Sequence, residues 1–344
     1  MTDLLAPLAY LHGQPTQSGT LKASPDDFIV SESLGFTPSG QGEHFLVRIK
    51  KRGENTQYVA NELAKACGVS SRQVSWAGLK DRHAVTEQWF SVHLPGKADP
   101  DLQAFIETHP GVISIEGTAR HQHKLRPGDL IGNQFTLCIR QLTDPQALLP
   151  RLEAITKEGV PNYFGAQRFG REGNNVEIAR AWGRGERKVR DKSKRSFYLS
   201  AARSLLFNQV VSARLNASLF DQTLVGDLCL DTQNQMFTAE QAGLQQPNIT
   251  APMTGDNALP TTADAEQFEL NVVEQEPDLL AVIRDNRMRH DRRLMRLLPQ
   301  SMAWTHEADT LTVSFFLPAG AFATAVMREV VIANEQGERD AHID

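Results

Sequence analysis

The chain has 344 residues, a formal net charge of −5, and 40% hydrophobic residues. This length suits an ordinary globular chain of about two domains. The acidic total argues against a protein that coats nucleic acid indiscriminately, because such proteins carry a large positive excess. The three cysteines, Cys67, Cys138 and Cys229, lie far apart and form no CxxC pair, so we expect neither a zinc site nor a disulfide framework.

Targeting and cofactor signals are weak. The sequence shows no positively charged leader with an apolar core, and no apolar run reaches the roughly 20 residues that span a bilayer. We therefore expect a cytoplasmic protein with no membrane partner. We also expect no cofactor and no metal, because the lone HxH at His121 and His123 lacks further ligands. No pattern indicates an obligate protein partner.

Alternating and amphipathic patterns predict both strands and helices in the first half of the chain. Asn55 is a suitable N-cap for a helix through Leu63 to Cys67, and Pro145 opens a second helix through Ile155. No GxGxxG follows a strand, so no nucleotide-binding Rossmann unit is indicated. The predicted strands are Asp27 to Glu32, Glu43 to Lys50, Gln88 to His93, Val112 to Ala119 and Gln134 to Arg140.

After Gly159 the pattern changes to helices, with a Pro- and Thr-rich interval from Gln246 to Thr262. Thr310 to Leu317 then alternates as a strand, which has no sheet of its own and must rejoin the amino-terminal sheet. We therefore predict an α+β fold with a discontinuous domain, residues 1–158 and 297–344, and an inserted helix-rich domain, residues 159–296. The predicted helices are Asn175 to Arg184, Phe197 to Leu215, Leu279 to Leu298 and Phe322 to Ala333.

One carboxylate, Asp81, has the surroundings of a catalytic anion. Lys80, Arg82 and His83 flank it, and cations within a few ångströms favour the ionised form of an acid. A persistent anion can attack or stabilise an electron-poor carbon. The same charges could also belong to a solvated surface turn. The strand that follows favours a loop held by rigid structure, where chemistry is usually placed.

The run Gly78 to Gln88 reads G-x-K-D-x-x-A-x-T-x-Q and resembles the signature of the TruD family of tRNA pseudouridine synthases. The resemblance implies a pseudouridine-synthase-like catalytic domain with a mixed, mostly antiparallel sheet and an inserted second domain. The resemblance assigns no individual residues between about 215 and 283. Four further segments are similar to family motifs: Lys22 to Glu32 (K-x-x-P-x-D-F-x-V-x-E), Gly132 to Phe135 (G-N-x-F), Asn162 to Gly170 (N-x-F-G-x-Q-R-F-G) and Leu317 to Thr324 (L-P-x-G-x-[FY]-A-T).

The resemblance implies isomerisation of uridine to pseudouridine in tRNA, at uridine 13 in the D-stem region. Asp81 would be the catalytic residue and Lys22 its partner. Three routes stay open for Asp81: attack at ribose C1′, attack at uracil C6, or removal of the C2′ proton. The alternation of apolar residues by itself favours core packing for Phe135. Core packing and contact with the flipped base therefore both stay open for this residue. The residues implied to hold the flipped base are Phe28, Asn133, Phe135 and Phe322.

Two basic clusters, Arg184 to Arg195 and Arg284 to Arg296, stand out in an otherwise acidic chain. They could form a phosphate-binding surface for tRNA, or they could be solvated helix faces. The residues expected to contact RNA are Lys80, Arg82, His83, Arg168, Arg187, Lys188, Arg190, Arg289, Arg292 and Arg293.

Two other functions remain open at this stage. An RNA-binding or chaperone protein could keep the fold without its chemistry, and the intact motif around Asp81 argues against this. A glycosidase that cleaves nucleosides would also use a carboxylate. The clustered basic charge, which suits an RNA-sized ligand, argues against the glycosidase.

Overall fold

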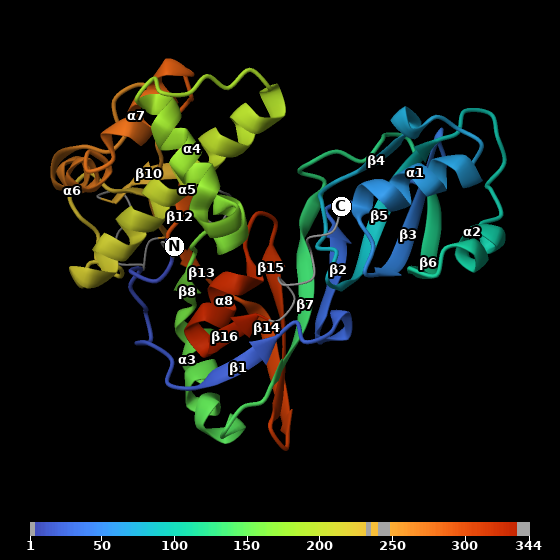
Figure 1. Cartoon of the computed structure of the whole chain (residues 1–344), viewed down its shortest axis with the longest axis horizontal. Coiled ribbons are helices and arrows are strands. Elements are labelled where there is room, and N and C mark those ends of the chain that lie inside the picture. Colours follow the sequence, from blue (N-terminus) through green and yellow to red (C-terminus); the bar gives the residue numbers. More distant parts are fainter. Residues whose placement is uncertain (1–3, 232–234, 240–247, 336–344) are drawn as a thin grey trace. The chain divides into compact units, whose positions relative to one another are not determined.

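The computed structural model describes residues 4–231, 235–239 and 248–335, which form two compact units (Figure 1). Of the described residues, those within 4–14, 157–298 and 321–329 form unit 1, and those within 15–156, 299–320 and 330–335 form unit 2. The domain limits expected from the sequence remain a prediction. Among the described residues, no helix is both long and apolar enough to cross a membrane.

Unit 2 is built on a ten-stranded sheet with the main order β14-β15-β7-β2-β5-β3-β6. Most neighbours are antiparallel, and β2 and β5 are parallel. The pairing of β15 with β7 confirms that the late strand rejoins the amino-terminal sheet. The strands on the main path are β2 (Phe28–Leu34), β3 (His44–Arg52), β5 (Val85–His93), β6 (Val112–His121), β7 (Leu130–Arg140), β14 (Gln300–Glu307) and β15 (Thr310–Pro318).

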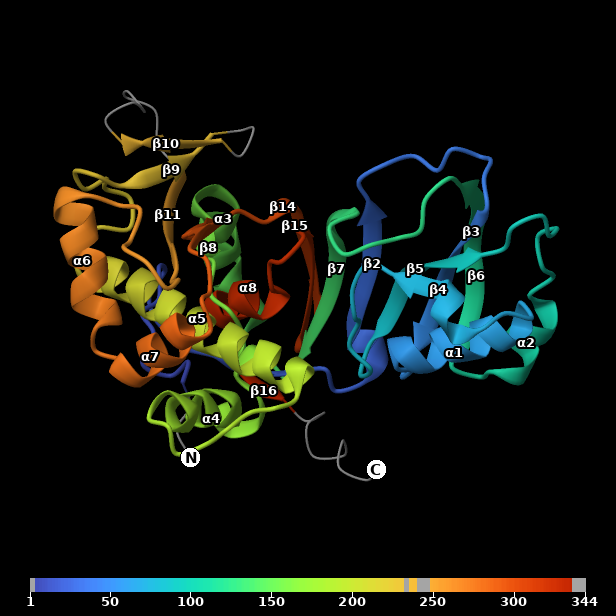
Figure 2. The same ribbon diagram turned by 90° about the horizontal axis from the view of Figure 1, so that it is seen from above.

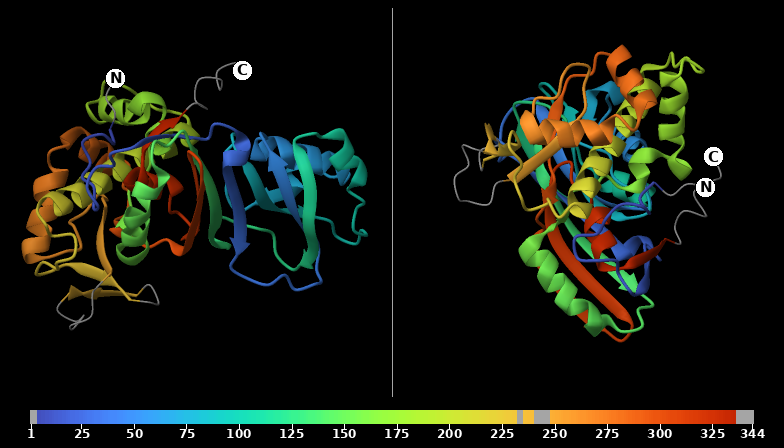
Figure 3. Two further views of the ribbon diagram at one scale, coloured as in Figure 1. Left: turned by 90° about the horizontal axis from the view of Figure 1, so that it is seen from below. Right: turned by 90° about the vertical axis from the view of Figure 1, so that its left-hand side faces the viewer.

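Three shorter strands extend this sheet. The strand β1 (Ser18–Leu21) pairs with β7 and with β16 (Ile332–Glu335), and β4 (Val74–Trp76) pairs with β5. The strands from β2 to β6, blue to teal in Figure 3, lie side by side. The sheet is thus mixed and mostly antiparallel, as the sequence predicts.

The helix α1 (Thr56–Ala66) covers one face of the sheet at β3 and β5 (Figure 2). The Asn55 side chain accepts the first free N–H groups of this helix, which confirms it as the N-cap. Val59 and Leu63 of α1 pack on the apolar side chains of the two strands. The remaining helices here are α2 (Gln103–Thr108) and α3 (Leu149–Glu158), with 3₁₀ turns at Pro25–Asp27, Ser71–Gln73 and Pro145–Leu148.

Unit 1 is rich in helices, as predicted, and also holds short strands. Leu205, Phe207 and Val210 of the long helix α5 are fully buried or nearly so in its core. The strands β9 (Leu228–Leu230), β10 (Met236–Thr238), β11 (Asn248–Met253) and β12 (Asp291–Leu294) form one sheet, and β8 (Val160–Pro161) pairs with β13 (Arg296–Leu297). The helices are α4 (Asn174–Gly183), α5 (Lys192–Asn216), α6 (Ala263–Val273), α7 (Pro277–Asp285) and α8 (Ala323–Val330).

The helix predicted from Leu279 to Leu298 is wrong beyond its first part. The helix α7 ends at Asp285, and Arg287 takes a left-handed backbone with φ of 50°. Arg292 and Arg293 belong to β12, which pairs with β11 in register from Met253 with Asp291. Arginine has a good helix propensity, but the strand pairing outweighs it here.

The register of unit 2 assembles one continuous row of side chains across five strands. Directly paired residues place their side chains on the same face of a sheet. Lys51 pairs with Thr86, Thr86 with Val30, Val30 with Phe135, and Phe135 with Phe315. Residues far apart in the sequence therefore share the face on which the predicted site lies.

Candidate active site

Asp81 and Lys22 form an ion pair in unit 2. The Lys22 Nζ donates to Asp81 Oδ2 at 3.1 Å, and the side chains are 19% and 29% exposed. The same ammonium lies 4.3 Å from the centroid of the Phe28 ring. The structure thus brings together three residues that the sequence predicts for the site. The lysine ammonium therefore holds the Asp81 carboxylate in a defined position.

Local structure fixes the position of Lys22. Its backbone is left-handed, with φ of 55°, a conformation that is costly for a residue with a Cβ and is found at functional sites. The buried Asp27 holds the following turn by accepting from Arg140 at 2.7 Å and from the Ser24 N–H at 2.9 Å. Although burial opposes it, these hydrogen bonds lower the pKa of Asp27. The amino-terminal motif therefore builds a rigid support for the lysine.

Side-chain hydrogen bonds from β5 and from the start of α1 anchor the loop that carries Asp81. Gln88 on β5 donates its side-chain N–H to the Gly78 carbonyl at 2.6 Å. The Thr56 hydroxyl, at the start of α1, donates to Gln88 Oε1 at 3.0 Å and accepts the Lys80 backbone N–H at 3.1 Å. These bonds hold the backbone on the amino-terminal side of Asp81. They give physical roles to Gly78 and Gln88 of the motif.

A buried charge cluster lies under this loop. The Lys80 ammonium is 2.6 Å from Oε1 of Glu32, whose side chain is fully buried, and Trp89 donates its backbone N–H to the other Glu32 oxygen. Burial raises the pKa of Glu32, and Lys80 opposes that rise. Lys51, only 1% exposed, donates to the Glu54 carbonyl at 2.8 Å. Burial, followed by repulsion from Lys80, lowers the pKa of Lys51 to about 8.

No motif in the sequence predicts a role for Lys51, Glu54 or Thr56, although the strand pattern carries a signal for the lysine. Lys51 continues the inward alternation of Phe45, Val47 and Ile49, so period two places it on the buried face. A lysine at an inward strand position is rare and needs a partner or a function.

Phe135 and Asn133 lie on β7 in the same unit. The Phe135 ring, 7% exposed, is 6.2 Å from Phe28 and 5.7 Å from Phe315, centroid to centroid. The Oδ1 atom of Asn133 is buried and has no hydrogen-bond partner in the described part of the chain. Gly132 is required for packing, because a Cβ there would lie 2.1 Å from the Leu317 carbonyl oxygen.

Phe322 and Arg168 lie together in unit 1. The Arg168 guanidinium is 5.7 Å from the Phe322 ring centroid and 5.5 Å from that of Phe164. A Cβ on Gly165 would lie 2.5 Å from the Thr324 hydroxyl, so the motif glycine permits this close approach. The motif around Phe164 and the motif around Phe322 therefore meet within one unit.

The predicted RNA contacts divide into exposed and buried residues. Arg187, Lys188 and Arg190 are exposed and take part in no ion pair among the described residues, and Arg82 and Arg289 are exposed as well, while His83 is half-buried. Lys80 and Arg292 differ from the exposed residues because each is paired with a glutamate. Lys80 is bound to Glu32, and the buried Arg292 donates to Glu269 at 2.8 and 2.9 Å. Both cations are already paired within the protein, and their contact with RNA stays a prediction.

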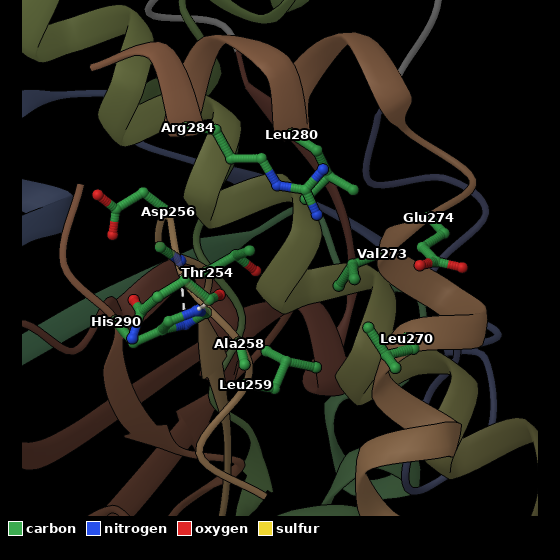
Figure 4. Close-up of a pocket in the computed structure, with 12 residues that line it drawn as sticks. Thr254, Asp256, Ala258, Leu259, Leu270, Val273, Glu274, Leu280, Arg284 and His290 are labelled. Carbon is green, nitrogen blue, oxygen red and sulfur yellow. Dashed lines mark hydrogen bonds between the residues drawn. The ribbon is translucent and has the colours of Figure 1, made fainter. Parts of the chain in front are cut away.

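A cavity of about 260 Å³ lies in unit 1 between α6, α7 and the segment after β11 (Figure 4). Leu270, Val273 and Leu280 contribute apolar side chains to its lining. The His290 Nδ1 accepts the Gly255 N–H at 3.0 Å and its Nε2 donates to a carbonyl at 2.7 Å, so the ring holds the wall in place. None of the predicted site residues lines this cavity. Within the described ranges, no group of three His, Cys, Asp or Glu side chains could hold a metal.

Comparisons with known proteins match almost the whole chain. The family model for tRNA pseudouridine synthase D (TruD) matches residues 6–189 and 184–330. The tRNA pseudouridine synthase D of Photobacterium profundum is 56% identical over 354 residues, with 100% of both chains covered. That of Vibrio campbellii is 53% identical, covering 99% of this chain and 100% of the relative.

A crystal structure from Methanosarcina mazei assigned to TruD has a TM-score of 0.70 and covers 94% of this chain and 95% of its own. It is only 20% identical, so it shows a shared α+β fold. The family model covers nearly the whole chain, and the relatives are more than half identical along their full length. The chain therefore belongs to the TruD family.

Proposed function

We propose that the protein isomerises uridine to pseudouridine in tRNA, at uridine 13, with Asp81 as the catalytic carboxylate. The observation that carries this proposal is the Asp81–Lys22 ion pair at 3.1 Å on an anchored loop, in a chain of the TruD family. Both side chains are partly exposed, so a substrate can reach the carboxylate.

The reaction breaks the bond between ribose C1′ and uracil N1 and forms one between C1′ and C5. The proton on C5 is lost and N1 gains a proton, so the atoms balance without oxidation or reduction. A carboxylate can stabilise or capture positive character at an anomeric carbon. Asp81 can do this at C1′; attack at C6 and removal of the C2′ proton remain the alternative routes.

Base recognition would use aromatic and amide side chains of β2 and β7. A flipped uracil needs an apolar or aromatic surface and hydrogen-bond partners for its edge. Phe28 and Phe135 supply aromatic rings, and Asn133 Oδ1 is an acceptor that a base N–H would satisfy. Phe322, which lies in unit 1, stays a prediction from its family motif.

The proposal is tested by tritium release from tRNA labelled at uracil C5, combined with mapping of the modified position. Asp81→Asn keeps the size of the side chain and removes its charge, so we expect turnover to fall at least roughly 100-fold with tRNA affinity unchanged within a few-fold. Asp264→Asn, at an exposed aspartate of α6, is the control and should keep full activity.

Other outcomes would identify the alternative functions. Release of free uracil would indicate a glycosidase, and tight tRNA binding without tritium release by the unsubstituted protein would indicate an RNA-binding protein. Turnover by Asp81→Asn at an appreciable fraction of the normal rate would exclude Asp81 as the catalyst. Activity on a tRNA whose uridine 13 is replaced by cytidine would contradict the proposed position.

A further inference from the structure

Arg168 in unit 1 is a half-buried cation that forms no ion pair with an acidic side chain among the described residues. Its Nη1 donates to the Ser200 hydroxyl at 3.1 Å, while its Nε is buried and has no hydrogen-bond partner in the described part of the chain. No carboxylate lies within ion-pair distance of it in the same residues. By contrast, Arg180 and Arg292 in this unit are each paired with glutamates.

A second arginine shares the same aromatic ring. The Arg293 guanidinium is 4.3 Å from the Phe164 ring centroid and donates to the Asn162 side-chain oxygen at 2.5 Å. Burial lowers the pKa of Arg168, and burial together with repulsion from Arg168 lowers that of Arg293 to about 10. Two positive charges are thus concentrated over Phe164.

The backbone beneath them is held firmly. The buried Asn208 side chain accepts the Phe164 N–H and donates to the Phe164 carbonyl, both at 2.9 Å. Phe164 therefore forms a fixed platform for the two guanidinium groups. A preorganised site of this kind costs little ordering entropy when a ligand binds.

Desolvating a cation without a counter-charge is unfavourable for folding. An anion that binds there removes the penalty, and the planar fork of a guanidinium matches a phosphate in two-point hydrogen bonds. In protein–DNA complexes the phosphate and sugar oxygens together receive half or more of the hydrogen bonds. The chemistry of the site therefore favours a phosphodiester.

We propose that Arg168 and Arg293, placed over Phe164 and beside Phe322, form a phosphate-binding site that takes one phosphodiester group of the RNA substrate. The assignment of RNA as the ligand rests on the proposed function. The positions of Arg168 and Arg293 over Phe164 do not depend on that function.

The test is a titration of tRNA binding at several salt concentrations with Arg168→Gln, Arg168→Lys and a matched control. Arg168→Gln should weaken binding roughly ten-fold at low salt and reduce the log–log salt slope by about 0.7–0.9. Arg168→Lys should keep most of the slope but lose affinity, because an ammonium lacks the planar fork. Arg171→Gln removes a 72%-exposed arginine three residues away and should change neither quantity.

Thermal unfolding separates a binding role from a structural one. If Arg168 serves binding, Arg168→Gln removes an uncompensated charge and should leave Tm unchanged or higher. A lower Tm with an unchanged salt slope would make Arg168 a packing residue and overturn the proposal, and so would unchanged affinity and slope. If inorganic pyrophosphate raises the Tm of the unsubstituted protein while Arg168→Gln binds tRNA normally, the site takes a free phosphate anion, and the RNA assignment is overturned.

Tritium release by the unsubstituted protein keeps this result separate from the proposed function. If Arg168→Gln changes the salt slope as expected but the unsubstituted protein releases no tritium, the phosphate site is supported and the proposed function is overturned. If the unsubstituted protein releases tritium and Arg168→Gln leaves the salt slope unchanged, the proposed function is supported and the phosphate site is overturned.

Discussion

Phe135 is a residue at which core packing and a proposed role in base binding coincide. It contacts Phe28 and Phe315 in the core, and it belongs to the motif expected to hold the flipped base. An alanine substitution would confuse the two roles, because loss of a buried phenylalanine costs about 3–5 kcal/mol of folding free energy by itself. The informative change is therefore one that keeps the volume and removes the ring.

We expect Phe135→Leu to lower turnover about ten-fold or more while lowering the free energy of unfolding by less than about 1.5 kcal/mol. Stacking of a base on an aromatic ring, worth roughly 1–3 kcal/mol, is the reason. Phe315→Leu is the matched control: it lies next to Phe135 in the same row, is fully buried, and should lose stability without a comparable loss of turnover. Equal losses of turnover in both variants would restore a pure packing role for Phe135.

Lys51 should make stability depend on pH in a defined window. Its pKa is lowered by burial to about 8 from an ordinary value of 10.5, so the unfolded chain holds the proton more tightly. Below about pH 8 both states are protonated. Between about pH 8 and 10.5 the unfolded state binds more protons, and stability contributed by Lys51 rises with pH.

Denaturant unfolding at pH 7, 9 and 10.5 checks whether the stability contributed by Lys51 rises with pH. The difference in unfolding free energy between the unsubstituted protein and Lys51→Met should shift in favour of the unsubstituted protein as pH rises, by an amount on the order of a few kcal/mol. A difference that stays constant over this range would show that Lys51 keeps an ordinary pKa in the folded protein.

At the scale of elements, the start of α1 and strand β5 together set the backbone of the loop that carries Asp81. Thr56→Val is isosteric and removes both hydroxyl hydrogen bonds, to Gln88 and from the Lys80 N–H. Leaving these buried partners unsatisfied costs about 1–3 kcal/mol. We expect turnover to fall roughly ten-fold with tRNA affinity almost unchanged, because a small misplacement of a catalytic group is costly.

Single-turnover kinetics and a binding titration measure the two effects separately. Thr56→Ser restores the hydroxyl and should recover most of the activity. If Thr56→Val is as active as the unsubstituted protein, the loop is held in place by other interactions.

The elements that could be predicted from the sequence are those in which local pattern and tertiary packing agree. The helix after Asn55 and the strands β2, β3, β5 and β7 follow from capping and alternation, and the motifs placed Lys22 beside Asp81 correctly. The arginine-rich stretch after α7 could not be predicted, because its strand state depends on pairing with β11, more than 30 residues away along the chain. The Glu32–Lys80 pair could not be predicted either, since register and burial decide it.

At the scale of the whole molecule, a chain with a net charge of −5 must attract a polyanion through a local concentration of positive charge. The exposed segment from Arg187 to Lys194, which leads into α5, supplies such a concentration. Asp191 caps the helix by accepting the Lys194 N–H, so its carboxylate is partly committed to the backbone. Arg184, just before the segment, is paired with Glu186 and Asp278 and contributes less free charge.

We expect the triple variant of Arg187, Lys188 and Arg190 to Glu to weaken tRNA binding and flatten its salt dependence. Each cation that no longer neutralises a phosphate lowers the log–log slope by roughly 0.7–0.9, so a full contribution by all three would lower it by about 2–3. Binding is measured by titration at several salt concentrations, with circular dichroism to confirm folding. A matched triple reversal at the exposed residues Arg72, Lys97 and Lys157 makes the same change of net charge. If the salt slope falls equally in the two triple variants, only the net charge matters, and the segment is a solvated surface; a decrease confined to the first variant identifies it as a site of phosphate binding.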